Sequence, residues 1–271
     1  MTRTTSPRAG WLDARLKVIP ARDPHDCPNQ PDSAMRLTGP VQRLASTLNR
    51  GRYERVMRLL TVTPRDRILE LGCGDGRRSI ARYNATNEIV GIDLMPPAHV
   101  RLERPNFRYE QGDASDLARF PDGAFDVAVS FGMLEHVHPE ARIRAVISET
   151  RRVAGRYCFI VPHRYAFIEP HFLLPLFALW PDRLKSALIR RFDVGTQRRS
   201  PSGRWQRINW LTEREWREQF DGPDVRILDH WYGPLLLDYL IVGEGESTRA
   251  SAAAGPVFGQ DQPLADDRLR P

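Results

Sequence analysis

The chain has 271 residues, a formal net charge of +6 at pH 7, and contents of 41% hydrophobic and 27% charged residues. These values are ordinary for one soluble α/β domain with additions, and no run of about 18 apolar residues is long enough to span a bilayer. Cys27, Cys73 and Cys158 are too widely spaced to suggest a disulfide framework or a zinc site, so we expect a reducing, cytoplasmic environment.

The N-terminal 40 residues are rich in Pro, Arg, Asp and Ser and show no sustained periodicity. We predict a mobile arm there, with one short helix around residues 11–18. The arm is basic but lacks the apolar stretch of a secretory signal, so export is not supported. At the other end, residues 247–271 are small and polar with Pro and Gly, which predicts a disordered tail.

Between these ends, residues 41–246 show the alternation of short β-rich runs, turns and helical segments that is typical of parallel βαβ units. A helix over residues 41–60, with Gly51 as a break, leads into the first strand. A second helix is expected over residues 139–153. Seven strands are expected at residues 67–71, 88–92, 107–110, 125–130, 157–161, 225–231 and 236–242. The pattern predicts an α/β fold, a Rossmann-like, mostly parallel seven-stranded sheet with helices on both faces and an antiparallel last strand.

A long insert, residues 162–220, separates the fifth and sixth strands and is too large for a mere connection. Thr212 followed by Glu215 forms a capping-box sequence that predicts a helix running to Phe220. By position the insert would act as a lid that shapes an acceptor pocket and excludes water. Packing against the sheet is the favoured interpretation of the apolar run FIEPHFLLPLFALWP. Contact with an apolar acceptor or with a membrane surface is the alternative.

The turn after the first strand contains Gly72, Gly74 and Gly76, whose missing side chains let the backbone approach a ligand closely. We read the following RRSIARY as a helix whose free N–H groups favour a carboxylate. Glu70, at the strand end, is suited to a cationic amino group. Each of the next two strands ends in an acidic residue, Asp93 and Asp113, so the three carboxylates should line one edge of the sheet.

The Glu70-to-Asp93 spacing also fits NAD, but the third glycine falls two residues after the second rather than three, which disfavours a dinucleotide. The run from RILELGCGDG through EIVGIDLMPP to EQGDASDLARFPDGAFDVAVSFGMLEHV resembles class I S-adenosylmethionine-dependent methyltransferases, specifically the type 11 group, over about residues 62–161. The resemblance implies a site for that methyl donor made of Glu70, Gly72, Cys73, Gly74, Gly76, Asp93, Leu94, Asp113, Ala114, Ser130 and Phe131.

Within that resemblance, the glycines and Glu70 would hold the methionine end, Asp93 the ribose, and Asp113 with Ala114 the adenine. Packing of Cys73 and Gly76, and a helix-capping role for Asp113, are the structural alternatives.

Two histidines are candidate catalytic bases. His136 follows the fourth strand near where the resemblance puts the methyl group, and His163 begins the insert. A histidine held in a cap or against the pocket wall is the alternative for His136. We expect no metal, because the spacing of the acidic and histidine side chains matches no zinc helix motif and carboxylate-rich magnesium ligation is not evident. The side chains considered were His136, His138, His163, Glu169 and His171.

The insert also holds the most basic part of the chain, in which arginines alternate with Trp205 and Trp210. The basic residues there are Arg183, Lys185, Arg190, Arg191, Arg198, Arg199, Arg204 and Arg207. Such a stretch can bind RNA, although a solvated arginine face is the commoner explanation, and the near absence of lysine is typical of codon bias. Against RNA, the fourth strand leads into SFGM, which lacks a Pro-Pro-aromatic motif and a catalytic cysteine.

The sequence therefore predicts a cytoplasmic methyltransferase, peripheral to a membrane if the insert binds lipid, that acts on a small-molecule, lipid or glycan-type metabolite. An RNA methyltransferase and a non-catalytic binder of the methyl donor remain alternatives, since a fold does not fix an acceptor.

Overall fold

The computed structural model describes residues 40–77, 79–195, 197–205, 207–222 and 224–246. The tail expected over residues 247–271 lies outside the described residues, and so does the arm over residues 1–40 apart from Pro40.

A single seven-stranded sheet forms the centre of the described structure, with the strand order β3-β2-β1-β4-β5-β7-β6. The first five strands pair in parallel, whereas β7 runs antiparallel to both of its neighbours, β5 and β6. The bounds are β1 Arg67–Leu71, β2 Glu88–Asp93, β3 Phe107–Gln111, β4 Phe125–Phe131, β5 Ala154–Pro162, β6 Arg226–Tyr232 and β7 Leu235–Glu244. All seven expected strands are present, and the Rossmann-like fold class with an antiparallel last strand is confirmed.

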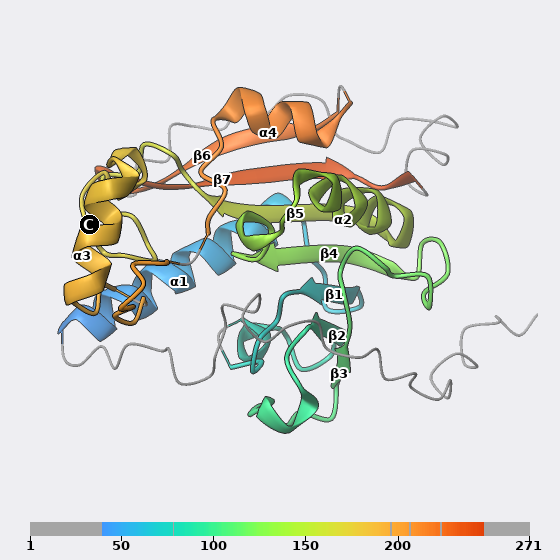
Figure 1. The fold of residues 1–271 in the computed structure, drawn as a ribbon. Coiled ribbons are helices and arrows are strands. Elements are labelled where there is room, and N and C mark those ends of the chain that lie inside the picture. The colour runs from blue at the N-terminus through green and yellow to red at the C-terminus, as the bar shows by residue number, and fades with distance from the viewer. Residues whose placement is uncertain (1–39, 78, 196, 206, 223, 247–271) are drawn as a thin grey trace, which may run out of the picture.

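Helices cover both faces of this sheet (Figure 1). Helix α1, Pro40–Leu59, packs through Val56 on the face that carries Ile68 and Val127, while α2, Glu140–Val153, and α4, Glu213–Phe220, cover the opposite face. The predicted break in α1 at Gly51 does not occur, because the helix continues through it. The near-continuous burial of β1, β4 and β5 follows from this two-sided cover.

The segment after the glycine turn departs from expectation, since the described residues of RRSIARY, which leave out its second arginine, contain the short 3-10 helix Ile80–Arg82 in place of an α-helix. Arg104 explains part of this, because its guanidinium donates to the carbonyl oxygens of Ile80 at 2.6 Å and of Tyr83 at 3.1 Å. Those carbonyls would otherwise accept bonds from a continuing helix. The helix N-terminus that the sequence suggested as a carboxylate site is therefore not available at this turn.

The insert lies beyond the carboxyl ends of β4 and β5, at the left of Figure 1, and has an apolar core of its own. This core contains Phe172, Phe177, Ile189, Val194 and Ile208. Phe172 and Phe177 belong to the apolar run, so the interpretation that the run packs on the sheet is wrong for these two side chains. The insert contains a 3-10 helix, Phe177–Leu179, and helix α3, Asp182–Arg191, before α4. The capping box of α4 forms as predicted, with Thr212 accepting from the Glu215 backbone and Glu215 accepting from Thr212.

Lys185 of α3 is almost fully buried beside this core. Its ammonium lies 4.6 Å from the centre of the Trp210 ring, 5.5 Å from Trp205 and 5.6 Å from Phe177, and it donates to the Ala178 carbonyl. Burial lowers the pKa of this ammonium. The aromatic rings provide the attraction to positive charge that compensates part of the lost hydration.

A bilayer-crossing helix was sought among the described residues, and none of their helices combines the required length with the required hydropathy.

Candidate donor and acceptor site

The acidic residues singled out in the sequence lie on neighbouring strands at one edge of the sheet. In the pairing register Glu70 of β1 is opposite Gly91 of β2, and Asp93 of β2 is opposite Gln111 of β3, just before Asp113. Because these strands are parallel, their carboxyl ends form one edge, where ligands of open α/β sheets bind. The structure thus brings the three carboxylates to the same edge, in the order predicted.

The turn between β1 and the Ile80–Arg82 helix has positive φ angles at Gly72 (+72°) and Gly74 (+55°), which side-chain-bearing residues rarely adopt. A Cβ atom at Gly72 would overlap the Met133 side chain, so this glycine permits close packing against the segment after β4. A Cβ atom at Gly74 would meet nothing within 4 Å. The backbone at Gly74 is therefore the part of the turn that a ligand can approach.

Glu70 is 1% exposed, and its Oε1 atom accepts a hydrogen bond from the Ser79 hydroxyl. Its other oxygen, Oε2, is buried near the Tyr83 hydroxyl, and neither of these two atoms has a hydrogen bond of good geometry among the described residues. Burial raises the pKa of this carboxyl to about 7, because the charged form loses its hydration. A buried acceptor without a well-placed donor is costly, so the atom is suited to a cationic or N–H ligand group.

Asp93 binds the glycine turn to its own strand end. Its Oδ2 accepts from the Gly74 backbone at 2.8 Å, and its Oδ1 accepts from the Met95 backbone at 3.0 Å. Each carboxylate oxygen can accept a second hydrogen bond, so the side chain can still meet a pair of hydroxyls. Next to it, Leu94 is 50% exposed, which is unusual for leucine at a strand end and leaves an apolar surface beside the carboxylate.

Asp113 is more engaged than the sequence suggested. Its Oδ1 accepts from both the backbone and the hydroxyl of Ser115, and its Oδ2 forms an ion pair with Arg142 of α2. The capping alternative considered for this residue is wrong, because residues 114–120 form turns rather than a helix and the bonds to Ser115 close a turn. Ala114 is buried in the core on the α2 side of the sheet.

Cys73 and Gly76 pack against neighbouring side chains. The Cys73 sulfur fills the space over Gly91, where a Cβ atom would lie 2.7 Å from it, and Gly76 faces Leu102 and Phe107. Burial and the nearby carboxylate of Glu70 raise the pKa of the Cys73 thiol well above its usual range. The Cys73 thiol is therefore a packing group in this structure. The contacts of Cys73 and Gly76 agree with the packing role that was the alternative to donor binding for both residues.

Ser130 and Phe131 are successive residues of β4 and so point to opposite faces of the sheet. The Phe131 ring stacks on Tyr53 of α1, with centroids 6.1 Å apart. The Ser130 hydroxyl is fully buried and has no hydrogen-bond partner among the described residues. The family resemblance implies that both residues floor the pocket near the methyl group, but their side chains point to opposite faces of the sheet, so they cannot line that floor together.

The two candidate bases have different surroundings. His163 stacks on Tyr239 of β7, its Nδ1 accepts from the Tyr165 backbone at 3.0 Å, and its Nε2 lies 3.5 Å from Asp229 of β6. His136 lies in the 3-10 helix Leu134–His136 that follows β4, and burial lowers its pKa to about 3. The imidazole is therefore neutral, as a base must be, but a group with so low a pKa holds a proton weakly, and the burial of His136 counts against it as a general base.

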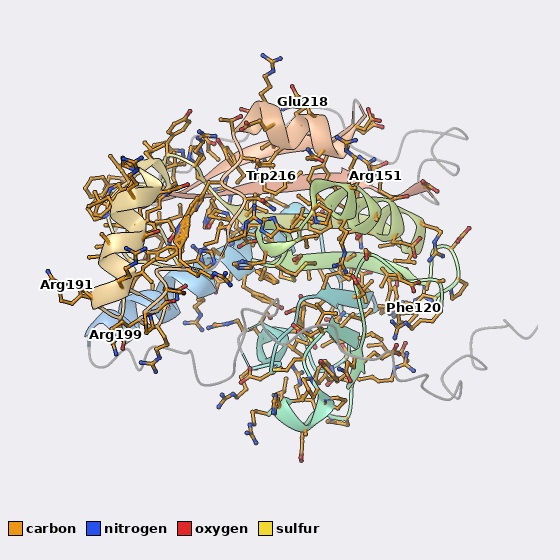
Figure 2. All side chains as sticks on the ribbon, in the orientation of Figure 1. Phe120, Arg151, Arg191, Arg199, Trp216 and Glu218 are labelled. Carbon is orange, nitrogen blue, oxygen red and sulfur yellow. The ribbon has the colours of Figure 1, made fainter. Side chains whose placement is uncertain are left out.

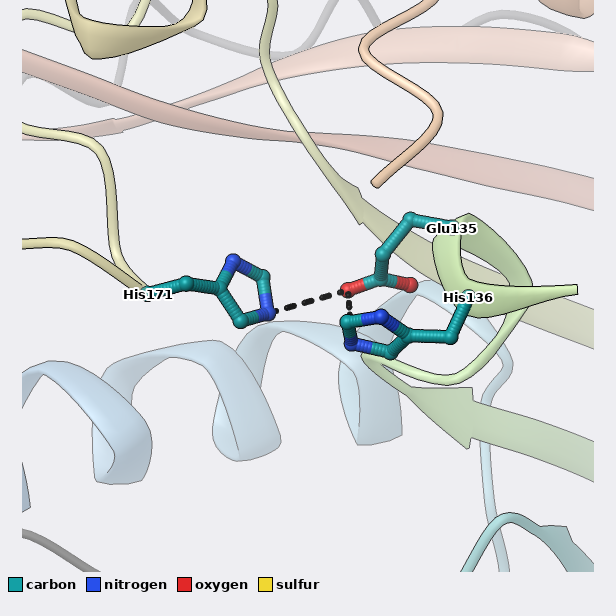
Figure 3. A group of neighbouring side chains, drawn as sticks. All are labelled: Glu135, His136 and His171. Carbon is teal, nitrogen blue, oxygen red and sulfur yellow. Dashed lines mark ion pairs between the residues drawn. The ribbon is translucent and has the colours of Figure 1, made fainter. Parts of the chain in front are cut away.

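His136 also belongs to a cluster that the sequence did not predict, shown in Figure 3. The side chains of Glu135, His136 and His171 meet there, with one ligand-type atom of each within 4.8 Å of the others. His171 comes from the insert, 35 positions after His136, so its approach depends on how the insert folds back. Burial raises the pKa of Glu135 to about 7.

Residues 68–155 match the family model described as a methyltransferase domain. An uncharacterized methyltransferase of Synechocystis sp. is 33% identical over 133 residues, which are 46% of this chain and 61% of that protein. A probable S-adenosylmethionine-dependent methyltransferase of Mycobacterium tuberculosis is 30% identical over 189 residues, covering 66% of this chain and 61% of that protein. The matched part of this chain is a class I S-adenosylmethionine-dependent methyltransferase domain.

The chain thus spans about three fifths of the length of these relatives. Among solved structures, the PH0226 protein from Pyrococcus horikoshii has a TM-score of 0.51 and 17% identity, and the match covers 79% of this chain and 95% of that one. This likeness concerns the fold alone.

The donor-side residues of the methyltransferase domain fit the group that the family uses. Glu70 offers a buried acceptor with no hydrogen bond of good geometry at Oε2, and the turn at Gly74 leaves open space where any side chain would project. The buried acceptor suits an ammonium group, and the open space lets the amino-acid part of a ligand approach the backbone of the turn.

The arginine- and tryptophan-bearing stretch of the insert is divided in the structure. Arg191 and Arg199 point outward from the insert (Figure 2), whereas Trp205 and Trp210 are turned inward around Lys185. The two indoles are therefore engaged in the insert, and the outward arginines match the solvated face expected as the alternative to RNA binding.

Proposed function

We propose that this protein transfers a methyl group from S-adenosylmethionine to a small-molecule, lipid or glycan-type metabolite. The observation that carries the proposal is the buried Oε2 atom of Glu70, which has no hydrogen bond of good geometry, beside the open glycine turn at Gly74. The family match over residues 68–155 supports the same activity.

On the donor side, Glu70 would accept a hydrogen bond from the ammonium group, and the Gly74 turn would pass close to the amino-acid part. Asp93 would accept from the ribose hydroxyls with its remaining lone pairs, and the exposed Leu94 would lie against the adenine. Asp113 would meet the adenine amine with whatever acceptor capacity its bonds to Ser115 and Arg142 leave. Roles for Cys73, Gly76, Ala114, Ser130 and Phe131 would be limited to backbone and packing.

S-adenosylmethionine supplies a methyl group on a sulfonium that is its own leaving group. The protein therefore has to align donor and acceptor and exclude water, and a base is required only for acceptors that must lose a proton. His136 is our first candidate for that base because it follows β4 at the carboxyl edge of the sheet. His163 is the weaker candidate, because both of its ring nitrogens are engaged. Its Nδ1 accepts from the Tyr165 backbone and its Nε2 lies 3.5 Å from Asp229 of β6, while its ring lies against Tyr239 of β7.

The acceptor class follows from the insert, which we interpret as a lid over residues 162–220 within a domain of residues 41–246. Several of its apolar side chains are exposed at the surface rather than packed in its core. They are Phe167, Leu173, Leu176, Leu179, Leu184 and Phe192. Exposed apolar groups of this number favour a lipid-like acceptor or a peripheral membrane contact. Localisation in the cytoplasm with such a contact is part of the same proposal.

An RNA acceptor is the second candidate, supported by the outward arginines but not by Trp205 and Trp210, whose rings surround Lys185. A protein that binds the methyl donor without catalysing transfer is the third candidate. Incubating the protein with methyl-labelled S-adenosylmethionine and fractionated cell extract distinguishes these three candidate functions. Label in the small-molecule or lipid fraction supports the proposal, label in RNA alone replaces the acceptor class, and no transfer leaves a binder.

Donor binding itself is tested by titration calorimetry with S-adenosylmethionine and with NAD. We expect binding of the former only, weakened more than tenfold by Asp93→Ala, because a hydrogen bond to a charged group contributes about 1.5–3 kcal/mol. Glu88→Ala, at the exposed opposite end of β2, is the matched control and should bind normally. Equal affinity in a folded Asp93→Ala variant would remove Asp93 from the site.

A further inference from the structure

The cluster after β4 combines two histidines and a glutamate that local sequence spacing would not assemble. The Glu135 Oε1 atom lies 3.9 Å from Nε2 of His136 and 3.7 Å from Nε2 of His171. Both separations are too long for a hydrogen bond. The two imidazole rings stand edge to face, with centroids 5.0 Å apart, and Figure 3 shows their nitrogens directed at the same carboxylate oxygen.

The carboxylate at the centre of the cluster lacks the donors that its burial demands. Glu135 is 1% exposed, and its Oε2 atom makes no hydrogen bond within the described residues. A buried carboxylate without donors is strongly disfavoured unless it pairs with a cation or coordinates a metal. Arg52 acts on His171 by its positive charge, but its guanidinium is bonded at 2.6 Å and 3.1 Å to Asp238.

His171 is held in the orientation that a metal ligand requires. Its Nδ1 atom lies 2.8 Å from Oε1 of Glu169, which leaves Nε2 facing Glu135. Glu169 is buried and fixed in turn by the backbone N–H groups of His171 and Phe172 and by the Trp210 indole. In metal-bound histidines, the ring nitrogen that does not bind the metal usually donates a hydrogen bond to a carboxylate, which fixes the ring orientation and the tautomer.

The surrounding charge also favours a cation. Glu135 and Glu169 belong to the cluster and its support, Asp238 acts on Glu135 from β7, and Arg52 opposes them with one positive charge. His136 is hydrogen-bonded to the Arg207 backbone.

We propose that Glu135, His136 and His171 bind one divalent transition-metal ion at the carboxyl end of β4. Two imidazoles and one carboxylate suit Zn²⁺, Co²⁺ or Mn²⁺ better than Mg²⁺ or Ca²⁺, which prefer oxygen ligands. With bonds of about 2.0–2.1 Å in tetrahedral geometry, ligand atoms lie about 3.3 Å apart. The two Glu135–histidine separations therefore need to close by roughly half an ångström, and the two imidazole nitrogens, which lie within 4.8 Å of each other, by up to about 1.5 Å.

Three protein ligands leave at least one position for an oxygen of water or of another molecule. The exposed fraction of the His171 side chain, 19%, gives that position a route to solvent. The proposal concerns this chain's own residues and does not depend on the proposed methyl transfer, although an ion there would lower the pKa of a hydroxyl bound to it.

Metal binding is tested on the full chain after treatment with a chelator. Titration calorimetry with ZnCl₂ and CoCl₂ should give one site per chain, and the Co²⁺ form should show visible absorption from its nitrogen and oxygen ligands. Glu135→Gln and His171→Gln should each weaken binding at least 100-fold, and Glu169→Gln, which removes only the support, should weaken it 10–100-fold. MgCl₂ should give no comparable signal.

His138→Gln is the matched control, because His138 lies in the same loop and is outside the cluster. Its binding should equal that of the wild type, and circular dichroism should show that every variant is folded. Absence of Zn²⁺ and Co²⁺ binding in the wild type would overturn the proposal without requiring any variant to fold. It would also be overturned if Glu135→Gln and His171→Gln bound the ions as the wild type does.

Discussion

The buried carboxyl of Glu70 gives a direct test of the donor-site geometry, through the pH dependence of stability. We consider Glu70→Gln, which keeps the shape of the side chain and removes the charge. Burial raises the Glu70 pKa from an ordinary 4.5 to about 7 in the folded protein, so the folded state holds this proton more tightly than the unfolded state does. The stability of the wild type therefore decreases as the pH rises from about 4.5 to about 7.

The sign and size follow from proton linkage. Below pH 4.5 the carboxyl is protonated in both states and contributes nothing, whereas above pH 7 it is ionised in both and the folded state bears the full desolvation cost. The values 4.5 and about 7 correspond to ~3 kcal/mol at 1.36 kcal/mol per pH unit. Glu135 adds a similar dependence to the wild type, so only the difference between wild type and variant isolates Glu70.

The assay is urea unfolding of wild type and Glu70→Gln at pH 5 and pH 8. We expect the wild type to lose about 2–3 kcal/mol more than the variant between these values, with no such difference for Glu54→Gln, an exposed glutamate of α1. The same pH change in stability for wild type and Glu70→Gln would refute the assignment of Glu70 as a desolvated acid. If the donor's ammonium meets Glu70, donor affinity should also increase as the pH rises to 7 in the wild type alone.

Two further predictions concern packing and charge. Gly72→Ala should destabilise the fold by about 1–3 kcal/mol more than Gly74→Ala in chemical denaturation, because both need a positive φ but only the Gly72 methyl overlaps Met133; equal losses would contradict the packing described. Arg52→Met should cost about 1–3 kcal/mol at pH 7, since it leaves the buried carboxylate of Asp238 with His230 as its partner, and an unchanged free energy of unfolding in the same measurement would show that α1 is anchored elsewhere.

Sequence patterns were sufficient for the sheet because each strand is a short apolar run bounded by turn residues. β1 matches its predicted bounds, and β5 is longer by four residues in all because Ala154, Gly155 and Arg156 precede it and Pro162 follows. The capping box at Thr212 was equally predictable, since it depends on two residues three positions apart. Local signals of this kind require no knowledge of the tertiary structure.

The errors arose where a distant side chain decides the local structure. RRSIARY has helical periodicity, but Arg104, from the segment before β3, takes the carbonyls of Ile80 and Tyr83. Asp113 ends its strand as expected, yet Arg142 of α2 reaches its carboxylate. Neither partner is recognisable from spacing along the chain.

The cluster around Glu135 was missed for the same reason. Glu135 and His136 are adjacent in sequence, but His171 reaches them only because the insert returns to the end of β4, where the Asn209 backbone donates to the Glu135 carbonyl at 2.8 Å. The Glu-His pair after the fourth strand, followed by a histidine in the insert, is the signal that a search could have used.

The position of Lys185 has a practical consequence for labelling this protein. The chain has two lysines, and Lys185 is the one that the structure describes, with its amine enclosed by three aromatic rings. Amine-directed reagents should therefore leave Lys185 intact in the native protein. Acylation of Lys185, followed by mass spectrometry, would report each opening of the insert without any engineered probe.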